Sequence, residues 1–167
     1  LVAALKDIDI HFEYSPEGSH TFIGDQCVDS QIRTLAVSSH VSPVAVIPEV
    51  RNFVDELLVS YGKNGRIVMD GRDIGTSVFP NADLKIFMVA DDKVRAQRRL
   101  NEMVAGGQNP DFQEVLENLK SRDYIDSHRE TSPLRQAEDA VVLDNSDMTL
   151  QDQMVWIKKL VEERFGK

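Results

Sequence analysis

The alternation of short apolar runs with longer helical segments is the feature that most constrains the fold of this chain. Two apolar runs, residues 84–89 and 140–143, are separated by segments with helical spacing at residues 92–105 and 111–129. Another apolar run, residues 67–69, precedes them. Short apolar runs that alternate with helices are typical of parallel strands covered by helices on both faces. The pattern therefore predicts an α/β fold built on a parallel sheet.

The first part of the chain has a different pattern. Apolar and polar side chains alternate over residues 8–14, and a Pro–Gly turn signal at residues 15–18 precedes a second short segment at residues 21–23. This is the pattern of two half-buried strands joined by a turn. We expect a small antiparallel unit over residues 7–28, followed by a short helix near residues 31–37.

Two further helices are expected from their start and stop signals. Apolar residues take helical spacing from Glu49, and Gly62 supplies the stop. The last helix is expected to begin after Thr149, which has Asp152 three residues later in the pattern of a capping box.

Composition excludes several classes of function. The 167 residues carry a formal charge of −9, which argues against sequence-independent binding to nucleic acid. The single cysteine, Cys27, rules out a disulfide framework and a Cys-based zinc cluster, and it suits a reducing cytosol. The longest uncharged stretch contains Ser, His and Pro, so no segment is expected to span a membrane. We expect a cytoplasmic protein without nucleic-acid or membrane partners.

Arginine placement indicates where the chemistry lies. The chain has eleven arginines, and seven fall within one stretch of the acidic sequence: Arg72, Arg95, Arg98, Arg99, Arg122, Arg129 and Arg135. The planar guanidinium group matches a phosphate with two parallel hydrogen bonds and keeps its charge. The alternative is a set of solvated helix faces on which each arginine pairs with a nearby acid.

Helical spacing puts three charged residues on one stripe of the segment 111–129. The stripe begins with Val115 and Leu119 and continues as Arg122, Asp126 and Arg129. An apolar start indicates that the stripe faces the core, where charges are costly unless they are paired or bind something. The stripe predicts an anionic ligand, and a buried ion-pair cluster is the alternative.

Two other groups of charges fit phosphate chemistry. Residues 70–73, Asp-Gly-Arg-Asp, follow the expected strand at 67–69, and ligands bind at that end of parallel strands. Asp70 can hold hydrated Mg²⁺, Gly71 leaves room for a phosphate, and Arg72 can bind it. Arg95, Arg98 and Arg99 stand near a helix start, where the helix dipole disfavours cations, which suggests a use in closing over phosphates. The alternative is neutralisation of these arginines by Asp91 and Asp92.

Three segments carry specific sequence patterns, residues 67–82 (IVMDGRDIGTSVFPNA), 42–51 (SPVAVIPEVR) and 122–129 (RDYIDSHR). They resemble the bacterial cytidylate kinase family, and the likeness extends over nearly the whole chain. The resemblance implies a three-layer nucleoside monophosphate kinase fold. Residues 1–48 would form the monophosphate-binding insert, and residues 49–167 the carboxyl-terminal part of the core with a short lid near 95–110.

The resemblance also implies an activity, which is transfer of the γ-phosphoryl group of ATP to CMP or dCMP with Mg²⁺, by a monomer. The implied residues are Ser42, Arg51 and Asp73 for the cytosine, Arg72 and Arg129 for the acceptor phosphate, Arg122 and Asp126 for the sugar, Asp70 for a water on Mg²⁺, and Arg98 or Arg99 for the ATP phosphates. An ion pair of Asp73 with Arg51 or Arg72 is the alternative to base reading.

One departure from the family concerns the donor site. The family carries a phosphate-cradling loop of the form G-x-x-x-x-G-K-[ST], and no match occurs in this sequence. We therefore expect the chain to be the carboxyl-terminal part of a longer enzyme and to be inactive alone. A kinase acting on UMP or on both pyrimidines, and a non-catalytic nucleotide-binding module, are the alternatives. The sequence encoded upstream of Leu1 would discriminate between the enzyme and the module.

Overall fold

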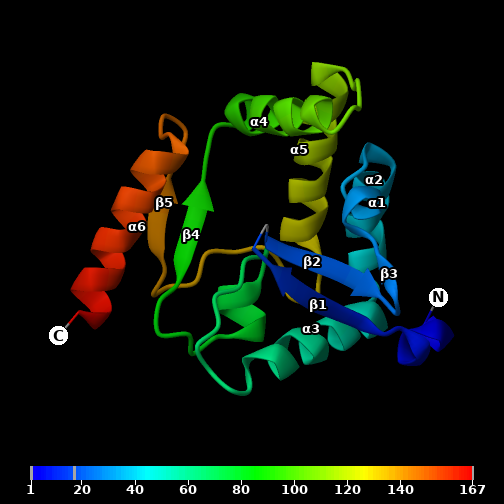
Figure 1. The fold of residues 1–167 in the computed structure, drawn as a ribbon, viewed down its shortest axis with the longest axis horizontal. Coiled ribbons are helices and arrows are strands. Elements are labelled where there is room, and N and C mark those ends of the chain that lie inside the picture. The colour runs from blue at the N-terminus through cyan, green and yellow to red at the C-terminus, as the bar shows by residue number, and fades with distance from the viewer. Residues whose placement is uncertain (1, 17, 167) are drawn as a thin grey trace.

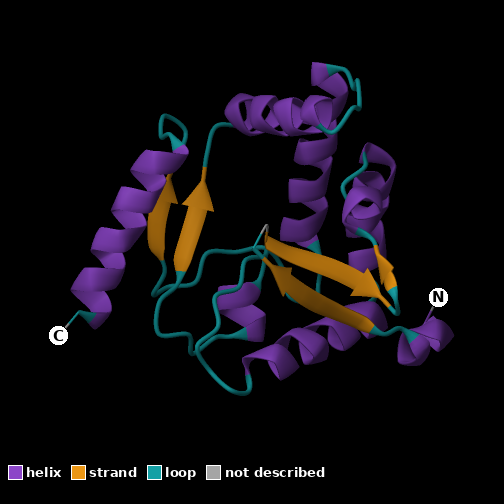
Figure 2. Ribbon diagram, viewed as in Figure 1, coloured by secondary structure: helices purple, strands orange, loops and turns teal. Residues whose placement is uncertain are grey.

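A computed structural model describes residues 2–16 and 18–166 as a mixed α/β structure (Figures 1 and 2). The elements in chain order are η1 (Val2–Asp7), β1 (Ile10–Ser15), β2 (Gly18–Ile23), β3 (Gln26–Cys27), α1 (Asp29–Ile32), α2 (Leu35–Ala45), α3 (Pro48–Gly62), η2 (Ile74–Val78), β4 (Ile86–Val89), α4 (Asp92–Ala105), α5 (Phe112–His128), β5 (Val141–Asp144) and α6 (Leu150–Phe165). None of the helices in the described residues has the length and apolarity needed to cross a bilayer.

The expected antiparallel unit is confirmed. Its three strands lie in the order β1-β2-β3, and both neighbouring pairs are antiparallel. Gly18, at the turn between β1 and β2, has φ +139°, a backbone conformation that side chains other than that of glycine rarely adopt. Glu17, within the expected turn, lies outside the described residues. A hydrogen bond links the antiparallel sheet to α3. The Tyr61 hydroxyl donates it to the carbonyl of Ile10 on β1 (2.8 Å).

The helix expected near residues 31–37 is interrupted. Residues 33 and 34 separate α1 from α2, so the expectation of one helix is wrong. The Thr34 side chain explains the break, since it accepts a hydrogen bond from the backbone N–H of Val37 (3.3 Å) and caps a new helix. The capping box at the start of α6 is confirmed, with Thr149 and Asp152 each accepting from the other's backbone N–H.

The parallel pairing is confirmed for two of the three expected strands. β4 and β5 pair in parallel, with Ile86 opposite Val141, and α6 lies alongside them (Figure 1). The α/β class is therefore confirmed. The expected strand at 67–69 is wrong, because these residues have no regular structure and Val68 is fully exposed. A strand needs a neighbour to accept and donate its backbone hydrogen bonds, and no strand among the described residues pairs with this segment.

Helix α5 organises the side of the molecule that carries the charged residues. It packs against α4 and α2, and in Figure 1 it stands between α2 and the β4–β5 pair. A buried apolar cluster lies between α4 and α5 and contains Ala96, Met103, Val115 and Leu116. Burial of this face of α5 fixes the rotation of the helix and so fixes where its charged residues point.

Candidate functional site

Three segments bring buried charged residues together in what we call the Arg–Asp cluster. Its members are Arg51 in the first turn of α3, Arg72 and Asp73 before the single π-helical turn η2, Asp126 in the last turn of α5, and Arg129 at the carboxyl cap of α5. Asp73, Asp126 and Arg129 are only 4%, 3% and 7% exposed. The predicted inward stripe of α5 is therefore confirmed for Asp126 and Arg129.

Asp73 is bound by two arginines of the cluster. Its carboxylate accepts two hydrogen bonds from Arg51 Nη1 (3.1 and 2.9 Å) and lies 3.4 Å from Arg129 Nη2. Arg51 is one of the two partners considered in the ion-pair alternative for Asp73. The structure has this ion pair, and Arg129 is a second partner that the sequence did not indicate.

Asp126 pairs with Arg72 and shares Arg129 with Asp73. Its carboxylate lies 3.3 Å from Arg72 Nε and 3.3 Å from Arg129 Nη1. Arg129 also donates from Nε and Nη2 to the carbonyl of Ser132 (2.8 and 2.6 Å). Burial, followed by the nearby charge of Arg51, lowers the pKa of Arg129 from its usual value. The cluster is thus a buried network of fixed charges.

Asp123, which the sequence did not indicate, and Arg95, one of the three arginines near the start of α4, extend the cluster toward α4. Asp123 accepts hydrogen bonds from Arg72 and from Arg95 Nη1, the latter at 2.6 Å. Burial alone would raise the pKa of the Asp123 carboxyl, but the hydrogen bonds from Arg72 and Arg95 outweigh it and hold that pKa below its usual range. Of the three arginines of α4, Arg95 is therefore the one tied to the cluster. The spacing of the α4 arginines signals a cluster, but it does not say which of them reaches α5.

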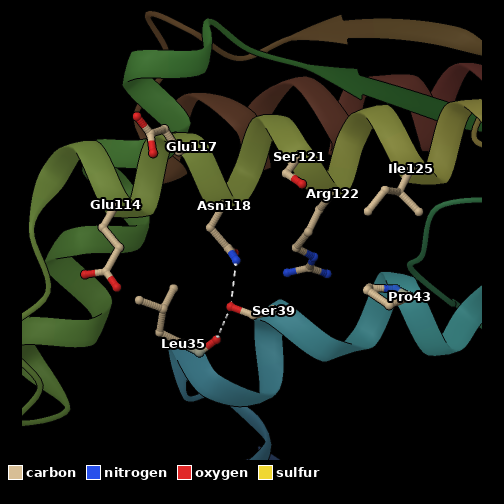
Figure 3. Close-up of a pocket in the computed structure, with 9 residues that line it drawn as sticks. All are labelled: Leu35, Ser39, Pro43, Glu114, Glu117, Asn118, Ser121, Arg122 and Ile125. Atoms are coloured by element: carbon tan, nitrogen blue, oxygen red, sulfur yellow. Dashed lines mark hydrogen bonds between the residues drawn. The ribbon is translucent and has the colours of Figure 1, made fainter.

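Arg122 lies beside a cavity between α2 and α5. It donates from Nη1 to Ser38 Oγ (2.8 Å), and Ser38 in turn donates to Asn118 (3.0 Å). The cavity measures about 350 Å³, within the range of small-molecule sites. Figure 3 shows the Arg122 side chain extending from α5 toward α2, opposite Pro43. Burial, with the charge of Arg72 nearby, lowers the pKa of Arg122.

Several buried polar atoms at the site have no hydrogen-bond partner among the described residues. The Ser42 side chain on α2 is fully buried, and its Oγ is unpaired. The Nε atoms of Arg51 and Arg122 are unpaired as well. Buried polar groups are rarely left unsatisfied in native proteins, and each one requires an explanation. These three atoms all belong to residues that the sequence predicted to bind the nucleotide.

The remaining predicted residues lie elsewhere. Asp70 is exposed, in the irregular segment before Gly71. A Cβ atom at Gly71 would meet Ile74 Cγ1 at 2.8 Å, so Ile74 occupies the space beside Gly71 that was expected to take a phosphate. Arg98 donates to the carbonyl of Asn145 (2.7 Å), and Arg99 to that of Arg33 (2.9 Å). These two arginines diverge instead of pointing at one place.

Comparisons with known proteins agree with the motifs. The sequence profile described as Cytidylate kinase matches residues 1–163. The cytidylate kinase of Bacteroides thetaiotaomicron is 48% identical over 169 aligned positions, covering 100% of this chain and 72% of that protein. That of Parabacteroides distasonis is 48% identical over 168 positions (99% and 73%), and that of Flavobacterium psychrophilum 45% over 163 (96% and 72%). The chain belongs to the cytidylate kinase family.

Proposed function

We propose that this chain provides the acceptor site of a phosphotransferase that moves the γ-phosphoryl group of ATP to CMP or dCMP. Membership of the cytidylate kinase family supports the reaction class and both substrates. The structural observation that carries the proposal is the Arg–Asp cluster, in which three arginines from separate segments converge on the buried carboxylates of Asp73 and Asp126. A preformed cluster of arginines and carboxylates suits a nucleoside monophosphate. Its phosphate can bind to arginine, and its base and sugar can donate hydrogen bonds to carboxylates.

The acceptor phosphate is assigned to Arg72 and Arg129. Each pairs with the Asp126 carboxylate, so a phosphate dianion would compete with Asp126 for arginines that are already in position. The sugar is assigned to Arg122 and Asp126, which stand one helical turn apart on α5.

The cytosine is assigned to Ser42, Arg51 and Asp73. The unpaired Ser42 Oγ and Arg51 Nε support this assignment, because both can serve acceptor atoms of the base. The exocyclic amine of cytosine would donate to the Asp73 carboxylate.

Catalysis in this class rests on position and charge rather than on covalent chemistry. Arg72 and Arg129 would orient the acceptor phosphate and stabilise the negative charge that gathers during transfer. Asp70 offers a solvent-facing carboxylate, the kind of hard oxygen ligand that Mg²⁺ accepts together with several waters, so it fits the role of holding that ion. When bound, Mg²⁺ would neutralise part of the negative charge of the donor phosphates. Arg98 and Arg99 are proposed to reach those phosphates only after leaving their present partners.

Arg129→Ala is expected to weaken CMP binding by about 1.5–3 kcal/mol, because hydrogen bonds from a charged donor contribute that much. Isothermal calorimetry of the 167-residue chain measures the effect. Arg135→Ala is the matched control, since Arg135 is an exposed arginine of the same loop. Unchanged CMP affinity in a folded Arg129→Ala variant would assign Arg129 to a purely structural ion pair.

Asp73→Asn is expected to lower the ratio of CMP affinity to UMP affinity by at least about tenfold, roughly 1.4 kcal/mol. A carboxylate accepts only, so it bonds the amine of cytosine and repels the carbonyl of uracil, whereas an amide can donate to that carbonyl. Calorimetry with both nucleotides measures the ratio, and Asp139→Asn, at an exposed position, serves as the control. Equal losses for the two nucleotides would mean that Asp73 supports the site without reading the base. Tighter binding of UMP than of CMP by the unmodified chain would favour a UMP-directed kinase.

A further inference from the structure

The register of the antiparallel sheet gathers three residues that are spread over ten positions of the sequence. Phe22 on β2 pairs with Cys27 on β3, and side chains two apart on a strand share a face, so His20 and Cys27 lie on the same face of the sheet. Asp29 follows two residues later, at the start of α1. These residues form no part of the Arg–Asp cluster.

His20, Cys27 and Asp29 place their ligand atoms close together. One such atom from each residue lies within 4.8 Å of the other two. The shortest of these contacts joins His20 Nδ1 to Asp29 Oδ2 at 2.9 Å. Separations of this size suit donor atoms that surround one tetrahedral ion with bonds of about 2.0–2.3 Å.

Neighbouring groups hold the histidine and the aspartate in position. The backbone N–H of Thr21 donates to Asp29 Oδ1 (3.0 Å), which leaves Oδ2 facing the imidazole. Ser15 Oγ lies 3.1 Å from His20 Nε2, which leaves Nδ1 as the nitrogen that donates to the carboxylate. Hydrogen bonds of this kind behind the ligands orient them in protein metal sites.

We propose that His20 Nδ1, Cys27 Sγ and Asp29 Oδ2 bind a zinc ion, with a fourth position open to water. An imidazole nitrogen, a thiolate sulfur and a carboxylate oxygen are the three donor types that zinc takes in proteins, and the thiolate disfavours Mg²⁺ and Ca²⁺. Binding releases the thiol proton of Cys27 to solvent. The proton that Nδ1 shares with Asp29 also leaves that nitrogen, so that the bound, neutral His20 ring carries its proton on Nε2, toward Ser15.

The ion would join β2, β3 and the start of α1. In the described structure, two contacts already join these segments. They are the His20–Asp29 pair and the hydrogen bond from the Val28 N–H to the Thr21 carbonyl (2.9 Å). A chain with one cysteine excludes a zinc cluster built on several cysteines. A site with one cysteine depends on strand register, which spacing alone does not give.

Metal titration of the intact 167-residue chain tests the site. Under a non-chelating reductant, one equivalent of Zn²⁺ is expected to be withdrawn from a chromophoric chelator. Co²⁺ in its place is expected to give the near-ultraviolet absorption of a cobalt–thiolate bond. Cys27→Ser and His20→Gln are each expected to weaken binding at least about tenfold, and Cys27→Ser to abolish the cobalt–thiolate band.

His11→Gln is the matched control. His11 lies on the neighbouring strand between Asp9 and Glu13 (4.0 and 3.7 Å), so it tests whether any histidine flanked by carboxylates on this sheet accounts for the metal. Its substitution is expected to leave both readouts unchanged. Cys27 is exposed, so serine there leaves the fold intact, and far-ultraviolet circular dichroism of the metal-free variants checks this. Equal zinc affinity in the unmodified chain and Cys27→Ser, or a cobalt spectrum without the thiolate band, would overturn the proposal.

Discussion

Mixed with ATP, Mg²⁺ and CMP, the 167-residue chain is expected to form no CDP above a protein-free control. Phosphoryl transfer is catalysed by positioning, and the donor phosphates need a backbone cradle and its lysine. No G-x-x-x-x-G-K-[ST] sequence occurs among these residues. Arg98 and Arg99 do not compensate, since they are bound to the carbonyls of Asn145 and Arg33. Chromatographic separation of the nucleotides after long incubation measures the product.

The same preparation should bind CMP in the calorimeter, which separates a missing donor site from a misfolded chain. Turnover that Asp70→Ala abolishes would contradict the expectation. The coding sequence upstream of Leu1 offers a second check. A phosphate-cradling loop encoded there would make the longer chain active, whereas an unrelated domain would favour a nucleotide-binding module.

Helices could be predicted from this sequence because their signals are local. The N-caps Asp91, Asp111 and Thr149 each bind the first backbone N–H groups of their own helix, so the start of the helix does not depend on distant residues. The segment 67–69 shows the opposite case. Its apolar residues favour a strand, but pairing depends on a neighbour that no local pattern specifies.

The site could be predicted in part for the same reason. Helical spacing predicted that Asp126 and Arg129 face inward on the same side of the helix, and both side chains are buried. The pairing of Arg95 with Asp123 joins α4 to α5, and it depends on how those helices pack. Arg98 and Arg99 differ by one position, a rotation of about 100° around the helix, which is enough to direct one toward α6 and the other toward residue 33.

Asp126→Asn is expected to lower the free energy of unfolding by about 3 kcal/mol, near the lower end of the cost of breaking a buried ion pair. The substitution keeps the shape of the side chain and removes its charge, which leaves Arg129 and Arg72 each with one carboxylate partner, Asp73 and Asp123 respectively. Because those ion pairs remain, we expect a loss of unfolding free energy at the lower end of the range for a broken buried pair. Urea unfolding followed by circular dichroism measures it.

Glu163→Gln is the control, because Glu163 pairs with Lys159 (3.8 Å) where both side chains are exposed and ion pairs contribute little. An equal loss in both variants would mean that burial of Asp126 does not matter to the cost. Inorganic phosphate then distinguishes a purely structural network from an anion site. It should raise the stability of Asp126→Asn more than that of the unmodified chain, since the anion no longer competes with a carboxylate for Arg129 and Arg72. Equal stabilisation of the two proteins would mean that these arginines are not available to a phosphate.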